Sequence, residues 1–505
     1  MMSASRAAFW YCSLTLLLWA LIPSLLFPNP PLDVVEGFAW GREMALGYTK
    51  HPPMQAWLLE LSYHLTGGHA FGAYWLSSLS VAVGYLCIWQ LAHRLGLDDW
   101  KAFWALVMTS VTFYFTLPLP EFNPNILQIP VWAAMILLFH RALEKGRLLD
   151  WILLGAVAAF GLYTKYFVAL LIGAIGLYAL VFSDARRSLA TPGPWIAGLV
   201  CGVLFLPHVL WLVDTNFVTL EYAGSRSRGP EGLMDHLWNP VNFFLAQIAN
   251  HAGLFIIAAL LLGLSGVRGL LAGKAAADGT SSPCPDDRFL LWFAFLPLAV
   301  ILLMSAVTGN EFKHMWGTPL FVLSGILAVR FLLPSGKVTL ERPALIGAVL
   351  IQTIFLGVIV GQALLEPLWK TKQSRIHYPG QESAELLTTI WREEMKTPLR
   401  FVAGDMWTAA HVTLFSEDRP TMYLDHDAAA SPWVDQADLR ENGVLLVWRG
   451  ESDTPPAPMS NLYPKAKRQG SLVLPYTLAA KMPPAIVNWT IIRPYEVVVS
   501  TPRQP

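Results

Sequence analysis

The sequence predicts an α-helical membrane protein that crosses the bilayer many times and ends in a small α/β domain. Of the 505 residues, 54% are hydrophobic and only 14% are charged, against about 25% charged residues in soluble domains. This composition excludes a water-soluble globular protein and a disordered chain. The chain after residue 365 is different, because it is polar and alternates short apolar segments with a helical pattern.

Apolar runs that approach the ~20 helical residues needed to cross a bilayer recur along the first part of the chain. We expect eleven spans, near residues 9–27, 71–93, 102–118, 126–143, 150–163, 166–182, 195–213, 241–264, 289–308, 314–333 and 345–365. A lysine in Tyr163-Thr164-Lys165 favours a break between the fifth and sixth spans, although one long tilted helix is the alternative. No small-residue cleavage site follows Pro23, so we expect the first run to be a retained anchor.

Lysine and arginine are distributed unequally between the predicted loops, and they favour the cytoplasmic side. With a cytoplasmic N-terminus, the loops on the opposite side hold only Arg42, Lys50, Lys165, Arg226, Arg228 and Lys313. An odd number of spans then places the tail outside. We therefore expect a transmembrane domain over residues 1–365 and an outer, periplasmic α/β domain over residues 366–505.

Within the tail, four segments have the composition of short strands: LRFVAGD, PTMYLD, GVLLVWRG and YEVVVS. The segment ESAELLTTIWREEM has helical periodicity instead. These patterns predict a small α/β domain.

The balance of charge and the cysteine content exclude several kinds of partner. Lys plus Arg equals Asp plus Glu at 35 each, so no basic excess is present to bind a phosphate backbone, and no nucleic-acid partner is expected. The four cysteines, of which three lie in apolar runs, form no disulfide framework and no zinc motif. No cofactor is clearly implied, and a divalent metal is not clearly required.

The first outer loop carries the most unusual group of charges. Asp33 and Glu36 are three residues apart and would share one face of a short helix. Lys50 and His51 follow, next to two prolines that stiffen the backbone. The alternative is that Asp33 caps a helix at the membrane surface and that Lys50 anchors the next helix at the interface.

Other polar residues are expected on the same side of the membrane. They are Glu121, Asn123, Asn125, Lys165, Arg226, Arg228, Lys313 and His314. Ionisable groups at membrane depth are costly and usually line a cavity or a substrate path, although each one alone is more often a snorkelling or capping residue. Their shared side favours a common site.

Four segments of the chain resemble the GT-C superfamily of membrane glycosyltransferases, specifically the glycosyltransferase family 39 or PMT-2-like group. This group includes bacterial aminoarabinose, galacturonic-acid and mannose transferases. The segments are PLDVVEGFAWGREMALGYTKHPPMQAWLLEL, FGAYWLSSLSVAVGYLCIWQLAHRLG, GLYTKYFVALLIG and FKHMWGTPLFVLSG. The resemblance covers roughly residues 30 to 325, and VAGDMWTAAHVTLFSEDRP in the tail is similar to the tails of some bacterial members.

The resemblance implies a GT-C fold and roles for individual residues. Asp33 falls on the family's first-loop catalytic acid, and Lys50 and His51 fall on the cationic site that meets a lipid phosphate. Lys165 and His314 fall on positions that face the same cavity in relatives. The chain departs from the family at Glu121-Phe122-Asn123-Pro124-Asn125, where relatives commonly have an Asp followed by a small apolar pair. Either Glu121 replaces that acid or the site works with a neutral amide.

The resemblance also implies an inverting sugar transfer on the periplasmic face of the bacterial inner membrane. The donor would be a polyprenyl-phosphate-linked sugar, and the acceptor a hydroxyl of lipid A, lipopolysaccharide core, another glycan or a protein. Asp33 or Glu36 could then act as the general base, although Glu36 could instead hold Arg42 or orient the loop. Cationic groups at Lys50, His51 and Lys165 would stabilise the leaving phosphate. Arg42, Glu121, Asn123, Asn125, Arg226 and Arg228 remain candidates for acceptor binding or for shaping the loops, and Lys313 and His314 for the phosphate.

Two other classes of protein could also place charges in a bundle of many helices. A transporter or flippase of a lipid-linked saccharide is the main alternative, but the sequence shows no internal duplication of the kind that many transporters have. A membrane-anchored sensor with an outer ligand domain does not account for eleven spans or for the charges in the first loop.

Overall fold

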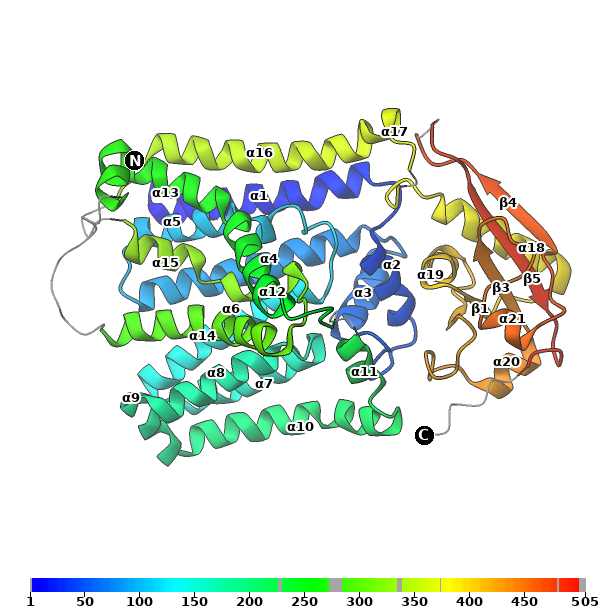
Figure 1. Ribbon diagram of the computed structural model, residues 1–505, viewed down its shortest axis with the longest axis horizontal. Coiled ribbons are helices and arrows are strands. Elements are labelled where there is room, and N and C mark those ends of the chain that lie inside the picture. The colour runs from blue at the N-terminus through cyan, green and yellow to red at the C-terminus, as the bar shows by residue number, and fades with distance from the viewer. Residues whose placement is uncertain are drawn as a thin grey trace.

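The computed structural model describes residues 2–225, 229–271, 284–333, 338–372, 374–478 and 481–498 (Figure 1). The first half of the chain forms α1 (Ala4–Leu26), α2 (Leu32–Gly41), α3 (Met54–Leu65), α4 (Gly72–Arg94), α5 (Asp99–Ser110), η1 (Phe113–Phe115), α6 (Pro124–Lys145), α7 (Leu148–Thr164), α8 (Val168–Val181), α9 (Ser183–Arg186), η2 (Arg187–Ala190), α10 (Pro192–Asp214), α11 (Val218–Ser225) and α12 (Asp235–Asn250). The second half forms α13 (Ala252–Leu271), α14 (Pro285–Thr308), η3 (His314–Phe321), α15 (Ser324–Phe331), α16 (Arg342–Leu364), α17 (Glu366–Trp369), α18 (Gly380–Met395), β1 (Phe401–Gly404), α19 (Met406–Phe415), β2 (Thr421–Leu424), α20 (Gln436–Asn442), β3 (Val444–Arg449), α21 (Met459–Leu462), β4 (Gly470–Leu474) and β5 (Ala485–Ile492).

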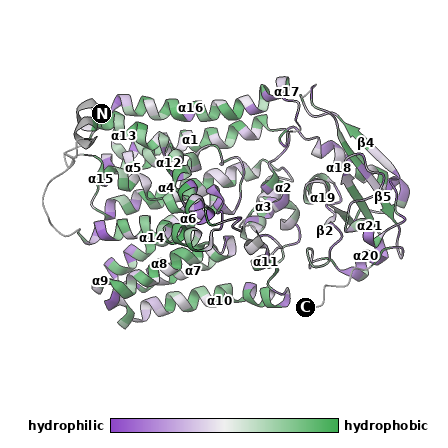
Figure 2. Ribbon diagram, viewed as in Figure 1, coloured by the Kyte–Doolittle hydropathy of each residue, from purple (hydrophilic) through white to green (hydrophobic). Residues whose placement is uncertain are grey.

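Long apolar helices make this a membrane protein with multiple spans. In the part of the chain that the structure describes, six helices are long and apolar enough to cross a bilayer, and two bent helix pairs raise this to eight. The six are α1, α4, α6, α10, α14 and α16, and α10, α14 and α16 are largely hydrophobic along their length (Figure 2). Only 17% of the apolar window of α10 is buried inside the protein, so most of its side chains can face lipid.

The expected count of eleven spans is not confirmed, because several of the predicted spans are short or bent. The run 102–118 gives the 12-residue helix α5 and a 3₁₀ turn, and the run 314–333 gives a 3₁₀ segment followed by the short helix α15. The run 241–264 is bent by 50° between α12 and α13. The break at Lys165 is confirmed, since α7 ends at Thr164 and Lys165 is extended.

The first outer loop folds into two short helices that the eleven-span description leaves out. Three prolines lie in the segment Pro28–Pro31, where the chain bends at residues 28 and 29 and is extended at Pro31 before α2 begins, and the pair Pro52-Pro53 precedes α3. Proline fixes φ and disfavours a helical conformation in the residue before it, so each of these proline-rich segments separates a new helix from the chain before it. In Figure 1, α2 and α3 lie between the long helices and the tail.

The tail contains a five-stranded mixed sheet with the order β2-β1-β3-β5-β4. β1 is parallel to β2 and β3, whereas β5 is antiparallel to β3 and β4. The predicted α/β class is confirmed, and so are the strands at LRFVAGD, PTMYLD and GVLLVWRG and the helix at ESAELLTTIWREEM. The predicted strand at YEVVVS is wrong over its described part, residues 495–498, because the last strand ends at Ile492 and Pro494 cannot donate a ladder hydrogen bond.

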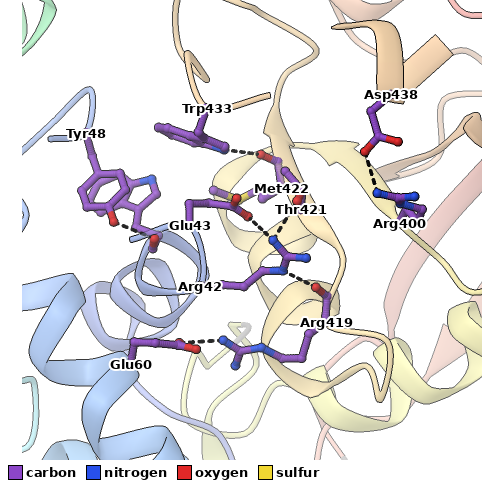
Figure 3. A network of polar contacts seen from close by, with 11 residues as sticks. Arg42, Glu43, Tyr48, Glu60, Arg400, Arg419, Thr421, Met422, Trp433 and Asp438 are labelled. Atoms are coloured by element: carbon purple, nitrogen blue, oxygen red, sulfur yellow. Dashed lines mark hydrogen bonds and ion pairs between the residues drawn. The ribbon is translucent and has the colours of Figure 1, made fainter. Parts of the chain in front are cut away.

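Helix α19 packs on both α2 and strand β1, so it connects the tail to the first outer loop (Figure 1). Arg42 donates hydrogen bonds to Glu43, to the Thr421 hydroxyl and to the Arg419 carbonyl (Figure 3). Arg419 forms an ion pair of 2.7 Å with Glu60 of α3, and its guanidinium lies 3.9 Å from the centre of the Tyr63 ring. These contacts hold α2 between the membrane helices and the tail.

Candidate active site

A cavity of about 650 Å³ lies where the outer-loop helices meet the ends of several long helices. It is lined by Leu32, Asp33, Glu36, Lys50, His51, Pro52, Glu121, Pro124, Asn125, Lys165, Tyr166, Phe167, Thr219, Tyr222, Lys313, Met315, Trp316 and Arg375. These residues come from α2, from the break between α7 and α8, from the start of α6 and from η3 and α11, all of which lie far apart in sequence. The cavity therefore depends on the assembled fold.

Three carboxylates enter this cavity. Asp33 and Glu36 lie one turn apart on α2, as their spacing predicts, and the N-cap position of α2 is Pro31 rather than Asp33. The Asn123 amide donates to the Asp33 carboxylate at 3.2 Å, and the Glu121 carboxylate accepts from the Asp33 backbone N–H at 3.2 Å. Asp33 and Glu121 are thus held side by side.

Burial raises the pKa of both neighbouring carboxyl groups, although nearby cations oppose the effect at Asp33. Desolvation is the largest cause of the raised pKa of Asp33, and Lys50 is the main group that lowers it. Desolvation followed by repulsion from Asp33 raises the pKa of Glu121 from 4.5 to about 7. Burial therefore favours the protonated form of each carboxyl group, and repulsion from Asp33 adds to this effect at Glu121.

Cationic side chains surround the carboxylates. Lys50 forms an ion pair of 2.5 Å with Glu36, whose side chain is only 5% exposed. Lys165 donates to the Asn125 side chain at 2.7 Å and lies 5.2 Å from the centre of the Trp316 ring. With Lys313 and Arg375, the lining has one more Lys or Arg than carboxylates, so it is suited to a ligand that carries negative charge.

The structure brings most, but not all, of the predicted site residues together. Asp33, Glu36, Lys50, His51, Glu121, Asn125, Lys165 and Lys313 line the cavity. Asn123 is not among the lining residues. Its side chain caps α6 and donates a hydrogen bond to the carboxylate of Asp33, which does line the cavity. Arg226 and Arg228 lie outside the described residues.

Two predicted placements need correction. His314 does not line the cavity, because successive residues of a 3₁₀ turn point in different directions; its Nε2 lies 3.4 Å from the Asn242 amide of α12. Glu36 does not hold Arg42, because the Arg42 side chain turns toward the tail and Lys50 occupies the place beside Glu36.

Sequence reasoning missed Arg375 and Gln55. Arg375 lies 11 residues after the end of the last long helix, α16, and reaches the cavity from the tail side. Its sequence neighbourhood, which also holds Lys370 and Lys372, does not single it out. Gln55 donates to the carbonyls of Asp33 and Phe122 at 2.8 and 3.0 Å. This buried amide joins α2 to the loop that carries Glu121, but a glutamine in an apolar helix gives no indication of its partners.

The arrangement can bind an anion, remove a proton with a carboxylate and stabilise developing negative charge. Among the described residues, no group of three or more His, Cys, Asp or Glu side chains could hold a metal ion.

The chain is similar to known proteins in sequence and in fold. Residues 50–211 match the PMT_2 family, described as dolichyl-phosphate-mannose-protein mannosyltransferase. The chain is 23% identical to the lipid A galacturonosyltransferase RgtD of Rhizobium johnstonii over 74% of this chain and 76% of the relative. It is 24% identical to the lipopolysaccharide core galacturonosyltransferase RgtA of the same organism over 92% of both chains. An undecaprenyl phosphate-alpha-4-amino-4-deoxy-L-arabinose arabinosyl transferase of Pseudomonas savastanoi is 26% identical over 52% of this chain and 48% of its own length.

A solved structure shares the fold. The crystal structure of ArnT from Cupriavidus metallidurans bound to undecaprenyl phosphate aligns with 96% of this chain and 98% of its own, with a TM-score of 0.57 and 14% identity. The matched family, the named relatives and the common fold agree with one another. The chain is therefore similar to the PMT_2 family over residues 50–211, and over most of its length it shares the fold of ArnT.

Proposed function

We propose that the protein transfers a sugar from a polyprenyl-phosphate donor to a hydroxyl of an envelope glycolipid or glycan, within the cavity described above. The observation that carries this proposal is the excess of Lys and Arg around two adjacent, partly buried carboxyl groups. The cations would bind the lipid phosphate, and a carboxylate would act as the base that removes the proton of the acceptor hydroxyl. The relatives named as galacturonosyl and aminoarabinosyl transferases support a transferase over a transporter.

The chemistry proceeds by a single displacement at the anomeric carbon. The acceptor oxygen forms a bond to that carbon while the bond from the carbon to the phosphate oxygen breaks, and the phosphate leaves with the bonding electrons. The acceptor proton passes to the Asp33 carboxylate. Because the nucleophile enters opposite the leaving group, the anomeric configuration inverts.

Positive charge from both ends of the cavity stabilises the leaving phosphate. Lys165 and Arg375 line the cavity from the membrane helices and from the tail side respectively. Lys50 is already paired with Glu36, so a bound phosphate would share this lysine with a carboxylate. In this proposal, Glu36 sets the position of Lys50 and does not act as the base.

Glu121 takes the place of the second acid in this proposal. Its contact with the Asp33 backbone and its place on the cavity wall support this choice. Asn125 instead holds Lys165 through its side-chain oxygen. A protonated Glu121 leaves the single negative charge of the pair on Asp33, where the base is needed.

The active site faces the periplasm in the inner membrane of a bacterium, with the N-terminus in the cytoplasm and the tail outside. The asymmetry of Lys and Arg supports this orientation. The acceptor is lipid A, lipopolysaccharide core, another glycan or a protein, and the relatives named for lipid A and lipopolysaccharide core favour the first two.

Substitution of the two α2 carboxylates separates a base from a positioning group. Asp33→Asn keeps the shape and removes the basicity, so kcat should fall about 10²- to 10⁴-fold. Glu36→Gln should instead raise the donor KM, because Lys50 loses its ion-pair partner, with a smaller loss of kcat, about tenfold. Purified variants assayed with a polyprenyl-phosphate sugar measure both constants. Near-normal kcat for Asp33→Asn would contradict the assignment of the base.

Glu121 gives the protein a dependence of stability on pH. Because its pKa rises from 4.5 to about 7 on folding, folding takes up a proton between these values, so this group's contribution falls as pH increases from 4.5 to 7. Glu121→Gln has no carboxyl group to lose a proton, so it does not lose this stability. The apparent Tm of the variant minus that of wild type should therefore increase between pH 5 and pH 8. Parallel melting curves would argue against a buried, protonated Glu121.

Reporter fusions test the orientation. Fusions after Phe27, Arg147 and Thr397 should report outside, inside and outside, respectively, because the positive loops stay in the cytoplasm. A cytoplasmic signal after Thr397 would place the tail and the cavity on the wrong side of the membrane for a periplasmic reaction.

A further inference from the structure

A second cavity, of about 410 Å³, adjoins the first on the side of the tail. It is lined by Leu32, Lys50, Ser374, Arg375, Tyr378, Asp405, Met406, Trp407, Arg449 and Tyr476. Leu32, Lys50 and Arg375 line both cavities. We call this space the outer pocket. A ligand in it would reach the place where the reacting groups lie.

Aromatic rings form one wall of the outer pocket. The Tyr378 ring centre lies 5.3 Å from that of Trp407 and 6.1 Å from that of Tyr476. Aromatic rings beside polar groups suit sugars, because a sugar ring has apolar C–H faces and a rim of hydroxyls. The same three rings could simply be part of the core of the tail, so a further observation is needed.

That observation is the hydroxyl of Tyr378. The residue is only 2% exposed, and its hydroxyl has no hydrogen-bond partner within the described chain. An unpaired buried polar group is costly, and this one belongs to a residue on the pocket wall. A ligand that accepts its hydrogen bond would remove the cost.

Charge in the outer pocket specifies the ligand further. Arg449, at the end of β3, makes one contact of 3.3 Å with Asp405, and its side chain is 46% exposed. Asp405 is largely committed elsewhere, since it caps α19 through the Trp407 and Thr408 backbone N–H groups. The guanidinium has five N–H donors in all, so several remain for a phosphate or carboxylate.

We propose that the outer pocket binds a phosphorylated sugar unit of a glycolipid acceptor of the lipid A type. Trp407 and Tyr476 contact the sugar ring, Tyr378 donates to it, and Arg449 pairs with its phosphate. This proposal rests on the proposed transferase function and names the acceptor's binding site. The acceptor is favoured over the donor because the rings and Arg449 come from the tail, whereas Lys165 and the aromatic groups Phe167 and Trp316 at the membrane helices line the other cavity.

Two substitutions test the outer pocket without disturbing the fold. Tyr378→Phe removes only an unpaired hydroxyl, so it should not lower Tm, and it should weaken lipid A binding about 3- to 10-fold. Arg449→Gln should weaken it about 10-fold or more. Arg400→Gln is the matched control, because Arg400 is also half-exposed, also pairs with one aspartate, Asp438, and does not line either cavity.

Native mass spectrometry of the full chain in detergent would measure apparent Kd for lipid A, for dephosphorylated lipid A and, separately, for undecaprenyl phosphate. We expect both outer-pocket variants to lose affinity for lipid A and to keep affinity for undecaprenyl phosphate. With the dephosphorylated lipid, Arg449→Gln should match the control, whereas Tyr378→Phe should still bind more weakly because its partner is the sugar. Unchanged lipid A affinity, no lipid A binding by wild type, or an equal loss for undecaprenyl phosphate would overturn the proposal. Failure of wild type to bind undecaprenyl phosphate, with lipid A binding intact, would instead contradict the proposed donor.

Discussion

The ion pair between Glu36 and Lys50 is the interaction on which the arrangement of the site depends. Glu36 is almost fully buried on α2, and a carboxylate there without a partner would cost several kcal/mol. The pair therefore ties the segment before α3 to α2, and it places a cation one helical turn from Asp33. Each of the other polar contacts at the cavity, from Asn123 to Asp33 and from Lys165 to Asn125, similarly satisfies a partly buried group.

The tail does more than cover the end of the helix bundle. Arg42 and Arg419 connect it to both helices of the first outer loop (Figure 3), and Arg375 and Arg449 carry positive charge from it to the two cavities. The site therefore has a membrane side, where a lipid-linked donor can arrive, and a tail side, where a sugar can be held. Separation of these sides fits a reaction in which the nucleophile attacks one face of a carbon while the leaving group departs from the opposite face.

The sequence predicts the membrane class, the α/β class of the tail and eight of the residues that line the cavity, because these follow from composition, local periodicity and the shared side of the loops. It does not predict the number of spans, since 3₁₀ segments and bends at residues such as His251 interrupt apolar runs without a change in hydropathy. The sequence also does not predict that Arg375 and Tyr378 belong to the site. Their contribution depends on how the tail docks on α2, which is a long-range arrangement that no local pattern specifies.

The most direct test of this account is an experimental structure of the protein with undecaprenyl phosphate. The account predicts that the phosphate lies in the cavity beside Asp33, with oxygens at about 2.7–2.9 Å from the side-chain nitrogens of at least two of Lys50, Lys165 and Arg375. A phosphate bound outside this cavity, or inside it without contact to any of these three residues, would contradict the account.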